Sequence, residues 1–283
     1  MTTRRRMTRR FFLESNVAGA ALAGLLGRLA VAADDKNPYG HFKMGIQSYS
    51  LRHYDVDEAL AKSKELGLKF WESFSKHFPL TDDAKKIDEY KKKLAGAGIT
   101  LMAYGVQGFG KDTDANRKQF EFAKAMGIKS ISADPTPEAF DNLDKLVEEY
   151  KINIAIHNHG PDDKKYGKIE QVLIAIANHH ERIGACVDTG HYLRSDESPV
   201  AAIQAFGPRT YGVHLKDVKK LPDGKKQFTI LGKGDLDLVG CLTALKKLRF
   251  EHCMSLEYEE NEKNPIADIR ECLATVQEAV KKV

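Results

Sequence analysis

Several common sequence signals are missing from this chain of 283 residues. Its four cysteines, at positions 186, 241, 253 and 272, show no C-x-x-C spacing, and no low-complexity segment or linker follows residue 40. No Gly-x-Gly-x-x-Gly follows the first apolar run, which weakens a dinucleotide-binding interpretation. The segment LGKGDLDL at residues 231–238 lacks the Gly-Lys-Ser/Thr ending of a P-loop. We interpret it as a turn that closes a small hairpin beside a binding site.

A long apolar run is also missing, although the N-terminus comes near to one. Residues 1–33 combine adjacent arginines before Phe11-Phe12-Leu13, a short Gly- and Ala-rich run, and a small-x-small cleavage site at Ala30-Val31-Ala32. This order is typical of an export signal, and the arginine pair resembles the twin-arginine type. The run is interrupted by Arg28 and is short for a membrane anchor, which needs about 20 apolar residues. We therefore expect a periplasmic protein with no stable membrane anchor. Because twin-arginine passengers usually cross already folded, we expect its thiols to be free and mostly buried.

An excess of charge of one sign disappears once this segment is removed. The whole chain carries +4, and residues 1–33 contribute +5 from six arginines and one glutamate, so the remainder carries −1. A near-neutral remainder has no electrostatic footprint for nucleic acid. About 250 residues remain, which is an ordinary length for a single α/β barrel.

Short apolar runs alternate with helical segments through residues 41–283. In the first helical segment Val56, Ala59 and Leu60 share one face, and Asp55 with Glu58 has the spacing of a capping box. The eight runs are residues 42–50, 68–74, 99–106, 128–135, 152–159, 183–191, 210–217 and 252–259. This alternation predicts parallel strands with helices outside, closed into one (β/α)8 TIM barrel over residues 41–283. In such a barrel, sites form at the C-terminal ends of the strands.

The last four runs each end in histidine or a carboxylate. These groups, the ligands of a borderline divalent metal, are His157 and His159, then Asp188 and His191, then His214, and finally Glu257 and Glu259. Residues two apart point the same way along a strand. The lower member of each pair is therefore the better ligand, which favours His157 over His159 and Glu257 over Glu259. Asn158 points the other way, and a turn-forming role before Gly160 is as good an interpretation as a role in the site.

Three motifs on successive strands resemble one known family. ACVDTGH (185–191), VHLKD (213–217) and SLEYE (255–259), in this order, are similar to the xylose-isomerase-like barrels. That group contains sugar isomerases and epimerases, endonuclease IV, inosose dehydratase and dehydroshikimate dehydratase. The resemblance implies one divalent ion held by residues on strands five to eight, and a histidine that touches substrate, here His191. The implied metal ligands are His157, Asp188, His214 and Glu257.

His157 departs from the family pattern, since many relatives have glutamate there. Two imidazoles and two carboxylates shift the metal preference from Mg towards a softer ion, and we expect Zn, Mn or Co. A metal-bound imidazole is a poor base because its lone pair is committed. A strict two-base epimerase is therefore disfavoured, and a single-base enolisation or a β-elimination fits better.

We expect a mechanism that begins with removal of a proton next to a carbonyl. A keto-sugar chelated by the metal would lose this proton to Glu257, and the metal would stabilise the enediolate. We expect Lys216 to act as an electrostatic or acid group, although a solvated loop lysine is an equal alternative. His159 or His191 would return the proton or protonate a leaving group. The weaker substrate-binding candidates are Asn158, Glu72, His77 and Arg52. The alternative interpretation is that Asn158 forms a turn and that the other three are charges exposed to solvent.

These residues predict a metal-dependent sugar isomerase or epimerase, with three rival interpretations. A lyase or dehydratase acting on keto-sugars or keto-glycosides uses the same ligands. A non-catalytic sugar-binding barrel would not need four ligands at the strand ends. A nuclease of the same fold needs further metal ligands and a basic face, which the near-neutral charge argues against. The expected partner is a small sugar, and homo-oligomers are frequent among similar proteins.

Overall fold

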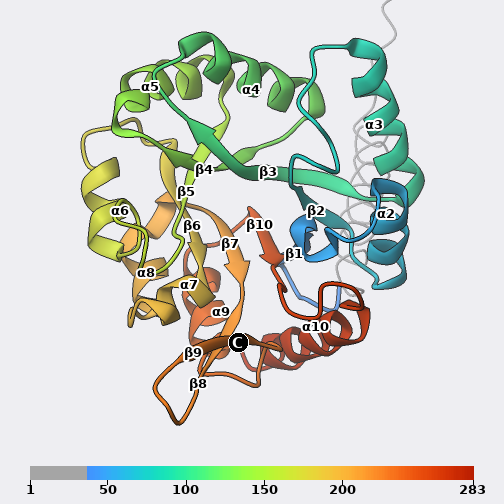
Figure 1. The fold of residues 1–283 in the computed structure, drawn as a ribbon, viewed down its shortest axis with the longest axis vertical. Helices are drawn as coiled ribbons and strands as arrows, with labels where there is room; N and C mark the ends of the chain where they lie inside the picture. The colour runs from blue at the N-terminus through green and yellow to red at the C-terminus, as the bar shows by residue number, and fades with distance from the viewer. Residues whose placement is uncertain (1–36) are drawn as a thin grey trace, which may run out of the picture. The chain divides into compact units, whose positions relative to one another are not determined.

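Eight parallel strands close into a barrel in residues 37–283, the part of the chain described by this computed structural model (Figure 1). Their order around the barrel is β1-β10-β7-β6-β5-β4-β3-β2. The strands are β1 (Lys43–Gln47), β2 (Phe70–Ser73), β3 (Thr100–Phe109), β4 (Ser130–Pro135), β5 (Asn153–His157), β6 (Ile183–Asp188), β7 (Thr210–Leu215) and β10 (Cys253–Leu256). Seven of them lie within a predicted apolar run and β3 extends three residues beyond the run at 99–106, so the predicted TIM barrel is confirmed.

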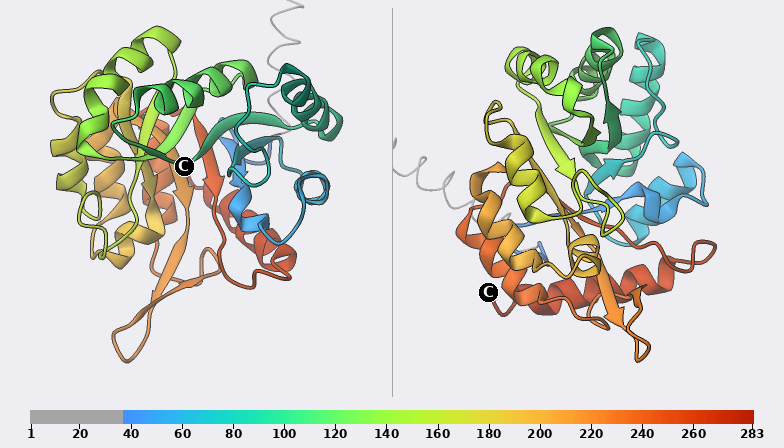
Figure 2. Two further views of the ribbon diagram at one scale, coloured as in Figure 1. Left: turned by 45° about the horizontal axis from the view of Figure 1, so that its top comes forward. Right: turned by 60° about the vertical axis from the view of Figure 1, so that its left-hand side comes forward.

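Helices surround the strands because each segment buries one apolar face against the barrel (Figures 1 and 2). The helices are α2 (Val56–Glu65), α3 (Ala84–Ala97), α4 (Thr113–Met126), α5 (Phe140–Tyr150), α6 (Ile169–Ile176), α7 (Thr189–Arg194), α8 (Pro199–Phe206), α9 (Leu238–Lys247) and α10 (Ile266–Val280). The capping box predicted for Asp55 and Glu58 is present at the start of α2. A short 3-10 turn, η2 (Ser48–Leu51), continues β1 at the barrel mouth.

The strand register places the four cluster positions either level with one another or two residues apart on neighbouring strands. Asp188 on β6 pairs with His214 on β7, and His214 is in turn level with Ser255 on β10. On the other side of β6, Cys186 is level with His157 at the end of β5. Neighbouring parallel strands lie about 4.8 Å apart, so side chains at corresponding heights are close enough to interact.

A two-stranded hairpin follows β7 and extends beyond the ring of helices (Figure 2). It consists of β8 (Asp217–Lys220) and β9 (Lys226–Thr229), which pair antiparallel. The hairpin was predicted, but its closing turn is residues 221–225 and not LGKGDLDL. That segment follows β9 and folds around the buried carboxylate of Asp217, which accepts hydrogen bonds from the backbone N–H groups of Gly232, Gly234 and Leu236 at 2.8–3.0 Å. Glycines suit this segment because a Cβ on Gly234 would lie 2.3 Å from the Asp217 carboxylate.

Two predictions about the rest of the chain have different outcomes. All four cysteines are free and buried, as expected. The expected export signal, residues 1–33, lies outside the described residues. Within the described residues, no helix is both long enough and apolar enough to cross a membrane.

Candidate metal centre and its cavity

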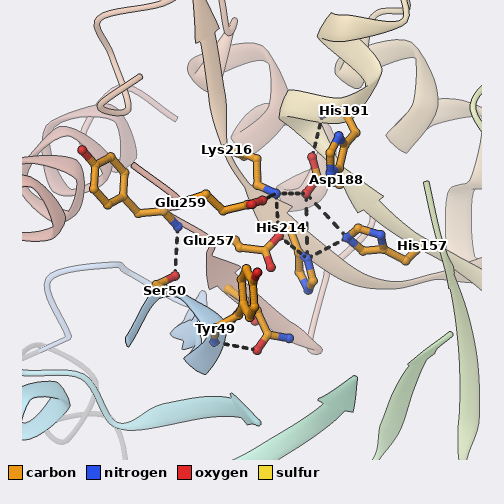
Figure 3. Close-up of polar contacts among 12 residues, drawn as sticks. Tyr49, Ser50, His157, Asp188, His191, His214, Lys216, Glu257 and Glu259 are labelled. Carbon is orange, nitrogen blue, oxygen red and sulfur yellow. Dashed lines mark hydrogen bonds and ion pairs between the residues drawn. The ribbon is translucent and has the colours of Figure 1, made fainter. Parts of the chain in front are cut away.

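Four side chains from adjacent strand ends meet at the mouth of the barrel (Figure 3). His157 and Asp188 are the last residues of β5 and β6, His214 lies on β7, and Glu257 directly follows β10. One ligand-type atom from each lies within 4.8 Å of the others, and all four residues are buried. The four positions singled out in the sequence are thus brought together in one cluster.

The distances within this cluster suit a small divalent cation. Nε2 of His157 lies 3.0 Å from Nδ1 of His214 and 3.6 Å from Oδ2 of Asp188. Nδ1 of His214 lies 3.2 Å from Oε2 of Glu257. Tetrahedral ligands about 2.1 Å from a common ion are about 3.4 Å apart. Oδ2 of Asp188 is buried and faces the cluster, with Nζ of Lys216 3.1 Å away. The donor set therefore fits a divalent metal ion.

Glu72 lies beneath the cluster and orients His214. Its Oε2 is 2.9 Å from Nε2 of His214, and its carboxylate also accepts hydrogen bonds from the hydroxyls of Ser132 (2.6 Å) and Ser255 (2.9 Å). Burial by itself would raise the pKa of Glu72, but His214 and these hydrogen bonds lower it below its usual value. A carboxylate on one ring nitrogen fixes the tautomer and leaves the other nitrogen available for a metal.

Lys216 is buried against the acidic side of the cluster. Its Nζ lies 2.7 Å from Oε2 of Glu257 and 3.1 Å from Oδ2 of Asp188, and it also donates to Glu259. Its side chain is only 3% exposed, so the alternative of a solvated loop lysine is wrong. Burial opposes the charged form, but the three carboxylates raise the pKa of Lys216 above its usual value. The site therefore contains a permanent ammonium group next to two of the candidate metal ligands.

Two further histidines stand above the cluster. The backbone N–H of His191 donates to Oδ1 of Asp188 at 2.7 Å, which caps the start of α7 and places the ring over the cavity. Burial, together with the nearby ammonium of Lys216, lowers the pKa of His191 to about 3, so its ring is neutral near pH 7. His159 is the more exposed of the two and lies 3.9 Å from the carboxylate of Asp163. Both rings line the cavity, where a bound molecule would reach them.

The four expected substrate-binding residues are not among the residues that line this cavity in the described part of the chain. Glu72 is engaged below the cluster. Asn158 is buried and spans β5 and β6 by bonding both the N–H and the carbonyl of Asp188, at 2.9 and 3.0 Å. Nε2 of His77 contacts the carbonyl of Tyr54 at 3.2 Å. Arg52 donates to the carbonyls of Tyr49 and Glu259. All four position other groups.

A cavity of about 420 Å³ opens above the cluster, within the usual range for small-molecule sites. Its lining residues are Gln47, Tyr49, Phe74, Ser75, Gly105, Val106, His157, His159, His191, Lys216, Glu257 and Glu259. The lining residues near the ends of β1, β2 and β3 had no predicted role, because in the sequence an apolar residue at a strand end looks the same as a core residue. Their place at the C-terminal ends of barrel strands is the sequence signal that could have identified them as cavity residues.

Comparison with known proteins gives one family. A family model described as "Xylose isomerase-like TIM barrel" matches residues 60–278. Among curated relatives, an inosose isomerase of Bacillus velezensis is 24% identical over 160 residues, which are 50% of this chain and 57% of the relative. An inosose dehydratase of Mesomycoplasma hyopneumoniae is 26% identical over 222 residues, 64% of this chain and 73% of the relative. The match thus spans little more than half the length of the first of these relatives.

A solved structure shows the same fold. The IOLI protein with a bound zinc atom superposes with a TM-score of 0.68 at 19% identity, covering 85% of this chain and 99% of the other.

Proposed function

Because this chain belongs to the xylose isomerase-like TIM barrel family, we propose that it is a sugar-modifying enzyme that uses one divalent metal ion. The observation that carries the proposal is the buried cluster of His157, Asp188, His214 and Glu257 at the barrel mouth. The donor set and the zinc in the IOLI protein support Zn, Mn or Co as the ion. The names of the relatives, inosose isomerase and inosose dehydratase, support a keto-sugar or keto-polyol as the substrate.

The proposed reaction starts with removal of a proton from the carbon next to a carbonyl. A bound divalent cation supplies Lewis-acid polarisation of that carbonyl. Glu257 faces the cavity and takes the proton through its carboxylate. Lys216, held against Glu257 at 2.7 Å, supplies positive charge beside the developing oxyanion. His191 and His159, whose rings are neutral near pH 7, line the cavity and are positioned to donate an N–H hydrogen bond to a substrate oxygen or a leaving group.

Two outcomes of this first step are supported equally. Return of the proton to a neighbouring carbon gives an isomer or epimer, and expulsion of a β-hydroxyl gives a dehydrated product. Glu257 and Glu259 are the only carboxylates among the described residues that line the cavity, and both lie in the segment that follows β10 and pair with Lys216. This arrangement fits one base better than two bases on opposite faces of the substrate.

The test is exchange of the substrate's α-proton with solvent. Metal-loaded protein is incubated with a panel of ketohexoses and inososes in D2O, and loss of the C–H signal is followed by NMR. We expect exchange with at least one keto-sugar, and a loss of at least about 100-fold for Glu257→Gln. Glu278→Gln, which alters an exposed carboxylate on α10 outside the cavity lining, is the control. Product NMR then separates isomerisation from dehydration.

A protein that binds metal but exchanges no proton from any of these compounds would contradict the proposal. Sugar binding that is independent of metal and unchanged in Glu257→Ala would favour a non-catalytic binder.

We also propose that residues 1–33 direct export to the periplasm. The measurement is the fractionation of cells that express the full chain, compared with an Arg9→Lys, Arg10→Lys variant. Equal periplasmic amounts of both proteins would contradict a twin-arginine route.

A further inference from the structure

The cavity has two walls of different chemistry. The polar wall comes from β5 onward and carries the metal cluster, Lys216, Glu259 and the two upper histidines. The opposite wall comes from the first three strand ends, and its apolar side chains are Tyr49, Phe74 and Val106. Of the polar residues on that side, Gln47 is engaged with its own chain, accepting from the N–H of Tyr49 and donating to the carbonyl of Gly105. Ser75 is exposed.

The ring of Tyr49 is held in place before any ligand binds. The guanidinium of Arg52 lies 4.5 Å from the centre of the ring, and the ring of Phe74 meets it edge to face at 5.4 Å. Arg52 is itself fixed, because it donates to the carbonyls of Tyr49 and Glu259 and pairs with Glu262 at 3.3 Å. A ring fixed in this way loses little conformational entropy on binding a ligand, which favours affinity.

Tyr49 nevertheless remains 37% exposed, one of the few large hydrophobic side chains in the described residues to do so. An exposed aromatic ring that lines a cavity commonly contacts ligand. The chemistry of the proposed reaction needs only the polar wall, since the metal ligands, the base and the proton donors all lie there. The apolar wall is therefore available for a part of the substrate that does not react.

We propose that Tyr49 and Phe74 form a ring subsite, which binds a flat apolar face attached to the sugar that reacts at the metal. This inference rests on the proposed function and narrows its substrate class from free monosaccharides to sugars that carry a second ring. Either an aryl group or a second sugar ring could occupy this subsite, because each presents a flat surface, of π electrons or of C–H groups, to an aromatic side chain. The site would then recognise a glycoside by its reacting sugar on one wall and its other ring on the opposite wall.

The test compares three probes on the metal-loaded full chain by NMR titration. Methyl β-D-glucopyranoside has no second ring, phenyl β-D-glucopyranoside has an aryl ring, and cellobiose has a second sugar ring. We expect a ring-bearing probe to bind about 3- to 10-fold more tightly than the methyl glucoside. A gain for the phenyl glucoside alone assigns the subsite to aryl groups, and a gain for cellobiose assigns it to sugar rings.

Variants then attribute the gain to the subsite. Tyr49→Ala is expected to remove the difference between probes, whereas Tyr49→Phe keeps it because the ring remains. Leu80→Ala is the matched control, since Leu80 is similarly exposed, at 39%, and lies outside the cavity lining. Equal affinity of all three probes for the unmodified protein, absence of binding, or an equal loss for all probes in Tyr49→Ala would overturn the inference. Such results leave metal binding and proton exchange intact, so they are distinguishable from failure of the proposed function.

Discussion

Glu72 contacts His214, a member of the candidate metal cluster, from outside that cluster. Its carboxylate is buried, faces the ring nitrogen of His214 away from the cluster at 2.9 Å, and is held by two serine hydroxyls. Removing a carboxylate that orients a metal-binding histidine typically weakens metal binding about 10- to 100-fold. We expect this loss for Glu72→Gln in a calorimetric titration with Zn. Glu278→Gln, on an exposed carboxylate of α10, is expected to bind normally. Equal affinity of the two variants would show that Glu72 does not tune His214.

The hairpin β8–β9 and the segment after it depend on one buried acid. The carboxylate of Asp217 accepts four backbone N–H groups, from Val218, Gly232, Gly234 and Leu236, at 2.8–3.0 Å. An amide in its place would direct its NH2 group at two of these donors and leave them unsatisfied. We expect Asp217→Asn to lower the free energy of unfolding by about 2–4 kcal/mol in urea denaturation. Asp223→Asn, at the exposed hairpin turn, should change it by less than about 0.5 kcal/mol. A similar small effect at Asp217 would mean that the segment holds its shape without this carboxylate.

A metal ion held by the cluster would connect the ends of four strands that are distant in sequence. Because such a site exists only in the folded barrel, metal at 100 times its dissociation constant adds about 2.7 kcal/mol to the stability of the whole molecule. For a domain of this size that corresponds to a rise of about 5–10 °C in Tm. We expect this difference between protein with Zn and protein with a chelator in calorimetry, and expect it to vanish in Asp188→Asn. An identical Tm with and without metal would contradict a site spanning these strands.

The sequence alone determined where the strands and helices lie and which residues end each strand. All eight predicted runs overlap a barrel strand, because buried parallel strands and amphipathic helices leave periodic patterns that depend only on local spacing. The four cluster positions were also predictable, because His157, Asp188, His214 and Glu257 lie near the ends of consecutive barrel strands and match the motifs of the xylose-isomerase-like family. Residues two apart point the same way along a strand, and this rule alone favoured His157, the lower of the two, over His159 as a ligand.

Tertiary structure decided the depth of each side chain and the identity of its partners. Glu72, His77, Asn158 and Arg52 lie near strand ends like the cluster residues, yet each is engaged by groups elsewhere in the chain and none lines the cavity described here. Likewise, Tyr49 and Phe74 look like core residues in the sequence and form a cavity wall in the structure. The physical reason is that periodicity reports the direction of a side chain along its own strand. Which strands become neighbours, and at what register, depends on contacts across the whole barrel.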